Sequence, residues 1–216
     1  PVTSDSLDEG DETFTVSLSD AISATIGTPM TATVTIDDND VTLFMPIIMS
    51  QVLLAPDLVV TDLNNNNGII EVTVTNQGNQ AVTEAFWVDV YIAPDSVPTA
   101  VNQTWPIVGQ FGMVWGDDGA TLAPNESLTL TLGDSFYNST ESTLPATIVA
   151  GTPLYAQVDS AHTGTVYGNV LESHEITGAP YNNISAFTAT STLNGLLQIE
   201  YSRTGQNGVG LPPRPN

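Results

Sequence analysis

The stretch Ile70-Glu-Val-Thr-Val-Thr75 decides the fold class, because apolar and polar side chains alternate along it. A period of two places the apolar side chains on one face of a β-strand. Similar alternation or β-rich composition predicts further strands at residues 13–18, 32–36, 87–92, 127–132 and 154–158. No stretch has apolar residues at helical spacing over three turns. The chain is therefore predicted to be all-β.

Turn-forming residues separate these predicted strands. Asparagine, aspartate, glycine and proline cluster at residues 64–68, 76–78, 117–119, 123–125, 151–153 and 178–180. These residue types favour the backbone angles and local hydrogen bonds of turns. Short strands joined by such turns are typical of antiparallel β-sandwiches.

The charge composition argues against several classes of function. The 216 residues include 24 acidic and only two basic residues, which gives a formal net charge of −22. Arg203 and Arg214 alone cannot neutralise a phosphate backbone, which argues against nucleic acid and anionic membranes as partners. The chain has no Cys, which excludes disulfides, thiolate catalysis and cysteine-ligated zinc. A hydrophobic fraction of 41% against 12% charged residues indicates a packed protein.

Nothing in the sequence marks a catalytic site. The Gly-x-Ser-x-Gly, His-Glu-x2-His and phosphate-loop motifs are all absent. The chain has only two histidines, His162 and His174, and we expect His174 to be an exposed residue at a strand end. The chain is therefore predicted not to be an enzyme.

The chain divides into four segments. These are a first unit (1–40), a connecting strand or linker (41–55), a complete sandwich (56–192), and a C-terminal strand with a Pro/Gly-rich tail (193–216). The longest apolar run, residues 41–49, is too short to span a bilayer, which needs roughly 20 apolar residues. Because the chain starts at Pro1, we expect a processed protein or a piece of a longer one. A composition rich in Thr, Asn and Gly predicts an extracellular or cell-surface location.

Carboxylates flank two predicted strands of the first unit. Glu9 and Glu12 precede one strand, and Asp37, Asp38 and Asp40 follow the other. If these strand ends lie on one edge of a sandwich, five negative charges converge and repel one another unless a cation lies between them. Calcium suits such a site, because it takes 6–8 oxygen ligands in flexible geometry.

The same residues carry a family resemblance. The pattern Asp5-x3-Glu-x2-Glu-x-Phe-x-Val-x-Leu18, followed by Ile36-Asp-Asp-Asn-Asp40, resembles the C-terminal part of a Calx-β domain over about residues 4–40. Calx-β domains are calcium-binding β-sandwiches of sodium–calcium exchangers and of many bacterial surface proteins. The resemblance implies that the five carboxylates are calcium ligands, with Asp5 a weaker candidate.

The first unit is too short to be a complete domain of this type. Such a domain needs about seven strands, and the chain supplies only about the last three, which leaves an apolar face uncovered. The missing strands could come from another chain by strand addition, from a longer precursor, or from packing on the second unit. A heterologous strand exchange that does not close into a ring would build a filament.

The second unit contains four motifs that carry another family resemblance: Pro56-Asp-Leu-Val-Val-Thr-Asp62, Pro124-Asn-Glu-Ser127, Glu172-x2-Glu175 and Asn182-Asn183. With these motifs, about residues 56–190 resemble the CARDB family, a group of Ig-like sandwiches named for cell adhesion in bacteria. The resemblance implies an antiparallel Ig-like β-sandwich, preceded here by a partial β-sandwich unit. It implies little about function, since sandwiches host many functions.

Two features of the second unit could bind a ligand. The oxygen ligands of Asp159, Glu172, Glu175, Asn182 and Asn183 lie near the ends of late strands and could form a second calcium site, or they could cap turns. The aromatic side chains could form a sugar-stacking platform, or they could be core and loop-anchoring residues. These are Trp87, Trp105, Phe111, Trp115, Tyr155, Tyr167 and Tyr181.

These observations predict a non-enzymatic structural or adhesive surface protein stabilised by calcium. It would be a subunit of a surface assembly or filament, completed by strand pairing with other copies of itself or with other surface proteins. Residues 193–216 could be the donated or docking segment, or a disordered terminus. The alternative is a carbohydrate- or protein-binding accessory module of a larger secreted enzyme or adhesin.

Overall fold

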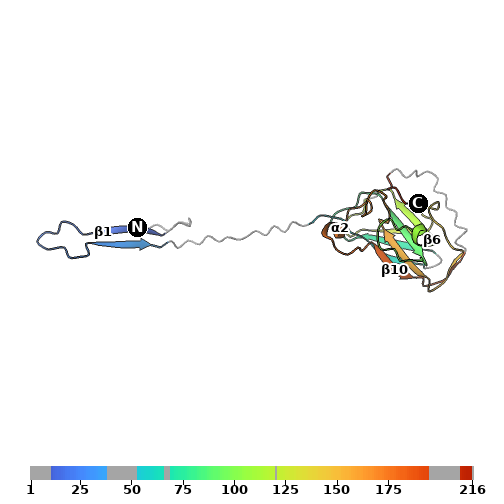
Figure 1. Ribbon diagram of the computed structural model, residues 1–216, viewed down its shortest axis with the longest axis horizontal. Helices are drawn as coiled ribbons and strands as arrows, with labels where there is room; N and C mark the ends of the chain where they lie inside the picture. The colour runs from blue at the N-terminus through green and yellow to red at the C-terminus, as the bar shows by residue number, and fades with distance from the viewer. Residues whose placement is uncertain (1–10, 38–52, 66–68, 120, 195–209, 216) are drawn as a thin grey trace. The chain divides into compact units, whose positions relative to one another are not determined.

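The computed structural model describes residues 11–37, 53–65, 69–119, 121–194 and 210–215. The chain divides into two compact units, residues 1–51 and residues 52–216, and each has its own strands (Figure 1). No helix within the described part of the chain is long and apolar enough to cross a membrane.

The first unit contains an antiparallel hairpin of β1 (Glu12–Ser17) and β2 (Thr31–Ile36). The register pairs Phe14 with Val34 and Val16 with Ala32, so these apolar side chains share one face and threonines occupy the other. No residue between 11 and 37 is buried, and Phe14 and Val16 are each 49% exposed. We call residues 14, 16, 18, 30, 32 and 34 the apolar face of the hairpin.

Two antiparallel sheets form the body of the second unit (Figure 1). One sheet has the order β3-β4-β7, with β3 at Leu58–Asn64, β4 at Glu71–Asn76 and β7 at Ser127–Thr131. The other has the order β10-β9-β5-β6, with β10 at Ile184–Thr188, β9 at Pro153–Val158, β5 at Phe86–Ile92 and β6 at Phe111–Asp117. The smaller elements are the strand pair β8 (Thr147–Ile148) and β11 (Leu193–Asn194) and the short helices α1 (Trp105–Val108) and α2 (Ser173–Thr177).

The main core lies between the two sheets of the second unit. Phe86, Val88 and Val90 of β5 belong to the same buried cluster as Val72 and Val74 of β4. The two sets share a face because successive residues of a strand point to opposite sides of the sheet. Burying such large aliphatic and aromatic side chains stabilises the fold by roughly 1.5–3 kcal/mol each.

The opposite face of β5 is buried as well. Trp87 and Tyr91 form a second cluster with Trp105 of α1, and Leu211 packs against it. Asp89 lies between them in sequence on the same face and is completely buried. The four-stranded sheet is therefore covered on both sides where β5 runs through it.

The structure confirms the predicted all-β class with antiparallel sheets. The alternating stretches fall on β1, β2, β4 and β7, and the predicted strands at 87–92 and 154–158 fall on β5 and β9. β6 was not predicted, because Phe111-Gly-Met-Val-Trp-Gly-Asp117 does not alternate: all but its first residue are buried. Residues 38–52, which include most of the predicted connector, lie outside the described residues.

Candidate metal centre

Three side chains of types that can bind a metal lie close together in the second unit. Asp57 directly precedes β3, while Glu172 and His174 lie at the start of α2. One potential ligand atom of each residue lies within 4.8 Å of those of the other two. Asp57 and Glu172 are 115 positions apart in the chain, so only the tertiary fold brings them together.

The short helix α2 positions two of these side chains. The Glu172 N–H donates to the Glu175 side-chain oxygen Oε2 at 2.7 Å, which fixes the first turn. Gly178 ends the helix in the left-handed region, with φ of +73°, a conformation that favours glycine. Glu172 precedes the helical residues, so its side chain can point toward β3 while His174 lies within the turn.

Glu172 is a fully buried carboxyl group with two hydrogen-bond donors. The Leu58 N–H donates to Oε2, and the Asn183 side-chain Nδ2 donates to Oε1 at 2.5 Å. Burial raises the pKa of Glu172 to about 9, although both hydrogen bonds favour the ionised form. Since no cationic side chain contacts this carboxyl within the described residues, the group holds a proton at neutral pH unless a cation replaces that proton.

His174 is 5% exposed and has no hydrogen bond on either ring nitrogen. Nδ1 lies 3.7 Å from Asp57 Oδ1, and Nε2 lies 3.5 Å from Glu175 Oε1. Burial lowers the pKa of His174, although the Asp57 carboxylate acts in the opposite direction. The imidazole is therefore neutral at pH 7, which is the form that binds metals.

The prediction that His174 is an exposed strand-end residue was wrong. It lies in α2, and the Tyr181 ring packs edge-on against its imidazole with centroids 5.5 Å apart. The strand-based interpretation did not anticipate the helical turn of α2 that contains His174. The Glu-x2-Glu pattern around His174 was the signal for this turn, since it places Glu175 at the capping position.

Asp57 is the most exposed of the three ligands, with 20% of its side chain accessible. Asn182 Nδ2 donates to its Oδ1 at 2.9 Å, and the Asp57 N–H donates to Asn76 Oδ1 at 3.1 Å. Asn182 and Asn183 thus orient one carboxyl group each, as supporting residues around metal ligands commonly do. The centre is open to solvent on the Asp57 side.

The other residues predicted for this site lie around it in different roles. Glu175 is held by the Glu172 N–H, and burial raises its pKa to about 7. Asp159 accepts hydrogen bonds from the backbone N–H groups of Asn169 (2.9 Å) and Val170 (2.8 Å), and burial raises its pKa to about 7 as well. Both Asp159 oxygens thus hold the loop that leads to α2, and Asp159 is not one of the three clustered ligands.

The donor set distinguishes between metals. Calcium takes oxygen ligands almost exclusively, whereas an imidazole with two carboxylates suits Zn²⁺ or a similar transition-metal ion. Asp57 and His174 were not anticipated from the sequence as ligands, and His174 changes the chemistry of the site. The residues fit a divalent transition-metal ion better than the calcium ion that was predicted.

The carboxylates predicted at the first unit are only partly within the described residues. Glu12 is paired with Ile36, which places Glu12 and Asp37 at the same end of the hairpin. Glu9, Asp38 and Asp40, like the weaker candidate Asp5, lie outside the described residues. The predicted calcium site therefore stays a prediction.

The aromatic side chains contribute largely to packing. Trp87, Trp105 and Trp115 are buried, and Trp115 packs edge-on against Tyr137 at a centroid distance of 5.6 Å. Phe111, Tyr155, Tyr167 and Tyr181 are partly buried.

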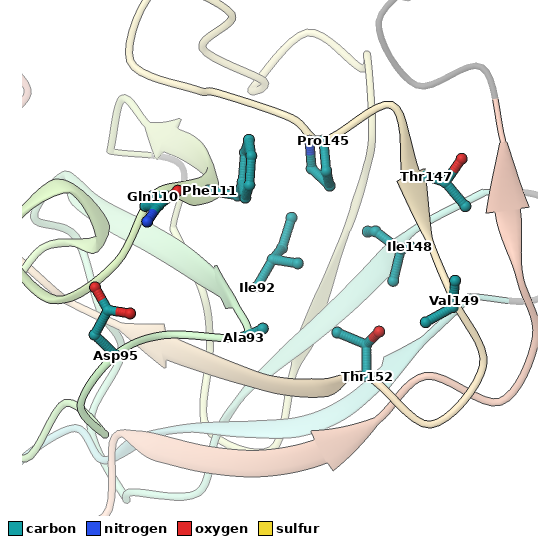
Figure 2. Close-up of a pocket in the computed structure, with 10 residues that line it drawn as sticks. All are labelled: Ile92, Ala93, Asp95, Gln110, Phe111, Pro145, Thr147, Ile148, Val149 and Thr152. Carbon is teal, nitrogen blue, oxygen red and sulfur yellow. The ribbon is translucent and has the colours of Figure 1, made fainter.

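A separate pocket of about 330 Å³ lies where β5 ends and β6 begins, beside β8 (Figure 2). Its apolar part includes Ile92, Phe111 and Ile148. Figure 2 shows Asp95 and Gln110 at one end of the pocket and Thr147 at the other. Its volume is at the lower end of the range for small-molecule sites.

No family model and no curated protein matches the chain, but several solved structures are similar to it. The chain is similar to a crystal structure of a CARDB domain from Pyrococcus furiosus in complex with di-metal ions, at 24% identity and a TM-score of 0.34 over 65% of this chain and 96% of that chain. A solution structure of the same domain matches at 22% identity and a TM-score of 0.31, over 64% of this chain and 97% of that chain. Beta-glucosidase from Kluyveromyces marxianus matches at 17% identity and a TM-score of 0.26, over 64% of this chain and 14% of that chain. CARDB is the family that residues 56–190 resemble, and the all-β assignment rests on the strand pairing itself.

Proposed function

We propose that this chain is a non-enzymatic structural or adhesive protein of an extracellular surface assembly, joined by strand pairing between subunits. The observation that carries this proposal is the apolar face of the hairpin. A two-stranded hairpin is at best marginally stable in water, and it needs further strands or a packing partner on its apolar side. Leu18 and Met30 extend this face and are 64% and 52% exposed.

The partner of this face would be β-structure from another copy of the chain or from another surface protein. Among residues 11–37, β1 and β2 pair only with each other, so a strand added at the outer edge of either one would gain main-chain hydrogen bonds as well as apolar contact. Calcium bound by Glu9, Glu12, Asp37, Asp38 and Asp40 would reduce the repulsion between these carboxylates.

A divalent ion at Asp57, Glu172 and His174 would stabilise the second unit in the same protein. The three side chains join β3 to α2 across the sheet edge, so one ion would crosslink segments that are distant in the chain. The unpaired, buried nitrogens of His174 support this assignment, because a buried polar group without a hydrogen bond is costly. The ion would contribute to folding stability rather than to chemistry.

The assembly proposal is tested with two variants that add the same charge to opposite faces of the hairpin. Val16→Asp places a carboxylate on the apolar face, and Thr15→Asp places one on the polar face. We expect the original chain and Thr15→Asp to form fibres or large oligomers in electron micrographs and in sedimentation velocity, and Val16→Asp to form no fibre and no species larger than a dimer. Equal assembly by the two variants, or a monomeric original chain at every concentration, would refute the proposal.

A second candidate function is carbohydrate binding at the pocket in Figure 2. Phe111 could stack against a sugar ring, and Asp95 and Gln110 could bond its hydroxyl groups. Titration calorimetry with neutral oligosaccharides tests this function, with Phe111→Ala as the variant and Val166→Ala, at an exposed position outside the pocket, as its control. Binding that only Phe111→Ala abolishes would favour this function.

A further inference from the structure

The C-terminal segment, residues 211–214, packs against β5 and β6 on the outer face of the four-stranded sheet. We call the residues that contact it, Trp87, Asp89, Gly116 and Thr163, the groove. Leu211 packs into the apolar cluster that contains Trp87. A methyl group added at Gly116 would lie 2.7 Å from Leu211, so glycine at this position of β6 makes room for the leucine.

Each residue of the segment has its own partner in the groove. Trp87 Nε1 donates to the Pro212 carbonyl oxygen at 2.7 Å, and the Thr163 N–H donates to the Pro213 carbonyl oxygen at 2.9 Å. The prolines cannot donate backbone hydrogen bonds, and here their carbonyl groups accept. The contact has the character of an extended, proline-rich peptide held between an aromatic side chain and a loop.

Arg214 supplies the charged end of this contact. Its Nη2 lies 2.7 and 2.9 Å from the two Asp89 oxygens, and its guanidinium lies 4.9 Å from the centroid of the Trp87 ring. Asp89 is completely buried in the centre of β5, where a carboxylate without a cationic partner would destabilise the fold. Arg203 is the only other basic side chain of the protein, and it is not preceded by Leu-Pro-Pro. Within this chain, residues 211–214 are thus the one sequence that satisfies the groove.

We propose that the same groove also binds residues 211–214 of a second copy of the chain. The contacts described above involve these four residues, and none of them depends on which chain the segment belongs to. Residues 195–209 connect β11 to the segment, and 15 extended residues span at most about 54 Å, which is long enough to reach a neighbouring molecule. Exchange of an identical element creates a subunit contact without requiring any new complementary surface.

Charge sets the conditions under which exchange occurs. Each copy carries a net charge of −22, so two copies repel each other at low salt. The Arg214–Asp89 pair is buried and is screened far less than this long-range repulsion. Exchange should therefore increase with protein concentration and with salt, unlike an assembly held by exposed ion pairs.

The proposal is tested by mixing two variants, one with an altered groove and one with an altered segment. This test does not depend on the proposed hairpin assembly. Both copies carry Val16→Asp, so that the apolar face of the hairpin cannot contribute. Asp89→Asn keeps the segment but breaks the groove, and Arg214→Gln keeps the groove but breaks the segment. We expect each variant alone to remain monomeric and the equimolar mixture to form a heterodimer of twice the 22.7 kDa chain mass in sedimentation equilibrium. The control mixes the Arg214→Gln chain with a chain that carries both Asp89→Asn and Arg214→Gln. Neither chain in this mixture has an intact segment, so it should give no heterodimer.

A second measurement does not depend on the stability of these variants. The Val16→Asp chain, whose groove and segment are unaltered, should show a dimer fraction that rises with concentration and with salt. A mixture that stays monomeric, together with a Val16→Asp chain that stays monomeric at every salt concentration, would overturn the inference. Loss of fibres in Val16→Asp combined with successful complementation would show that the hairpin and the C-terminal groove are separate interfaces.

Discussion

The protonation of Glu172 predicts that the cation-free protein becomes less stable as the pH rises above neutrality. Its pKa is raised from 4.5 to about 9 by burial. Between these two values the native carboxyl group holds a proton that the unfolded chain has released. The native state therefore binds more protons, and raising the pH in this window favours the unfolded state.

The expected magnitude follows from the width of the window. One proton corresponds to about 1.4 kcal/mol per pH unit, so Glu172 alone should lower the free energy of unfolding by about 2 kcal/mol between pH 7 and pH 8.5. This range separates Glu172 from its neighbours. Asp159 and Glu175, with pKa values of about 7, are half ionised at its lower end and reduce the stability by only about 0.4 kcal/mol each within it, and His174, whose pKa is lowered, is already neutral.

Urea unfolding in the presence of a chelator, followed by tryptophan fluorescence, measures this slope. Glu172→Gln is the matched control, because glutamine cannot ionise but has nearly the same shape as the protonated side chain. The variant should lose most of the difference between pH 7 and pH 8.5, although its amide group meets the donors of Leu58 and Asn183 and lowers stability at both pH values. A stability that is flat or rises over this range, or an equal slope in Glu172→Gln, would refute the assignment of a buried, protonated carboxyl group.

Three further predictions concern the cation, the C-terminal segment and the core. Zn²⁺ at about 100 times its Kd should stabilise the protein by about 2.7 kcal/mol, raising the melting temperature by about 5–10 °C in differential scanning calorimetry, and His174→Ala should abolish this shift. Arg214→Gln should destabilise the second unit by about 3 kcal/mol in urea, because it leaves Asp89 buried without its partner, and adding Asp89→Asn should recover part of that loss. Leu130→Ala, at a completely buried position, should cost about 2–5 kcal/mol, whereas Leu171→Ala, at an exposed one, should change stability by no more than about 0.5 kcal/mol in the same assay.

The metal centre shows how far local patterns can be interpreted. Asp159, Glu172, Glu175, Asn182 and Asn183 were predicted to form one oxygen-rich region. The structure places Glu172 in the centre, where Asn183 donates a hydrogen bond to Glu172 and Asn182 donates one to Asp57. Asp57 was not anticipated as a ligand, because it is 115 residues away from Glu172 and directly precedes the opening strand β3. Proximity of this kind is created by strand pairing, for which a single sequence carries no direct signal.

The C-terminal segment is a second example. Its Pro/Gly-rich sequence was compatible with either a docking segment or a disordered terminus, since prolines and glycines are common in both. Residues 211–214 dock on their own sheet because Asp89 and Trp87 lie on the outer face of β5. Only the register of the strands decides which side of the sheet these two residues face.

The sequence by itself determined the all-β class, most strand positions and the absence of recognisable catalytic motifs. These properties are local: alternation of side chains, turn residues and composition act within a few residues of one another. The tertiary structure alone decided that β5 is buried on both faces, that Asp57 meets Glu172 and His174, and that Arg214 neutralises Asp89. Such contacts join residues more than 100 positions apart, and their energies depend on burial, which exists only once the sheets have packed.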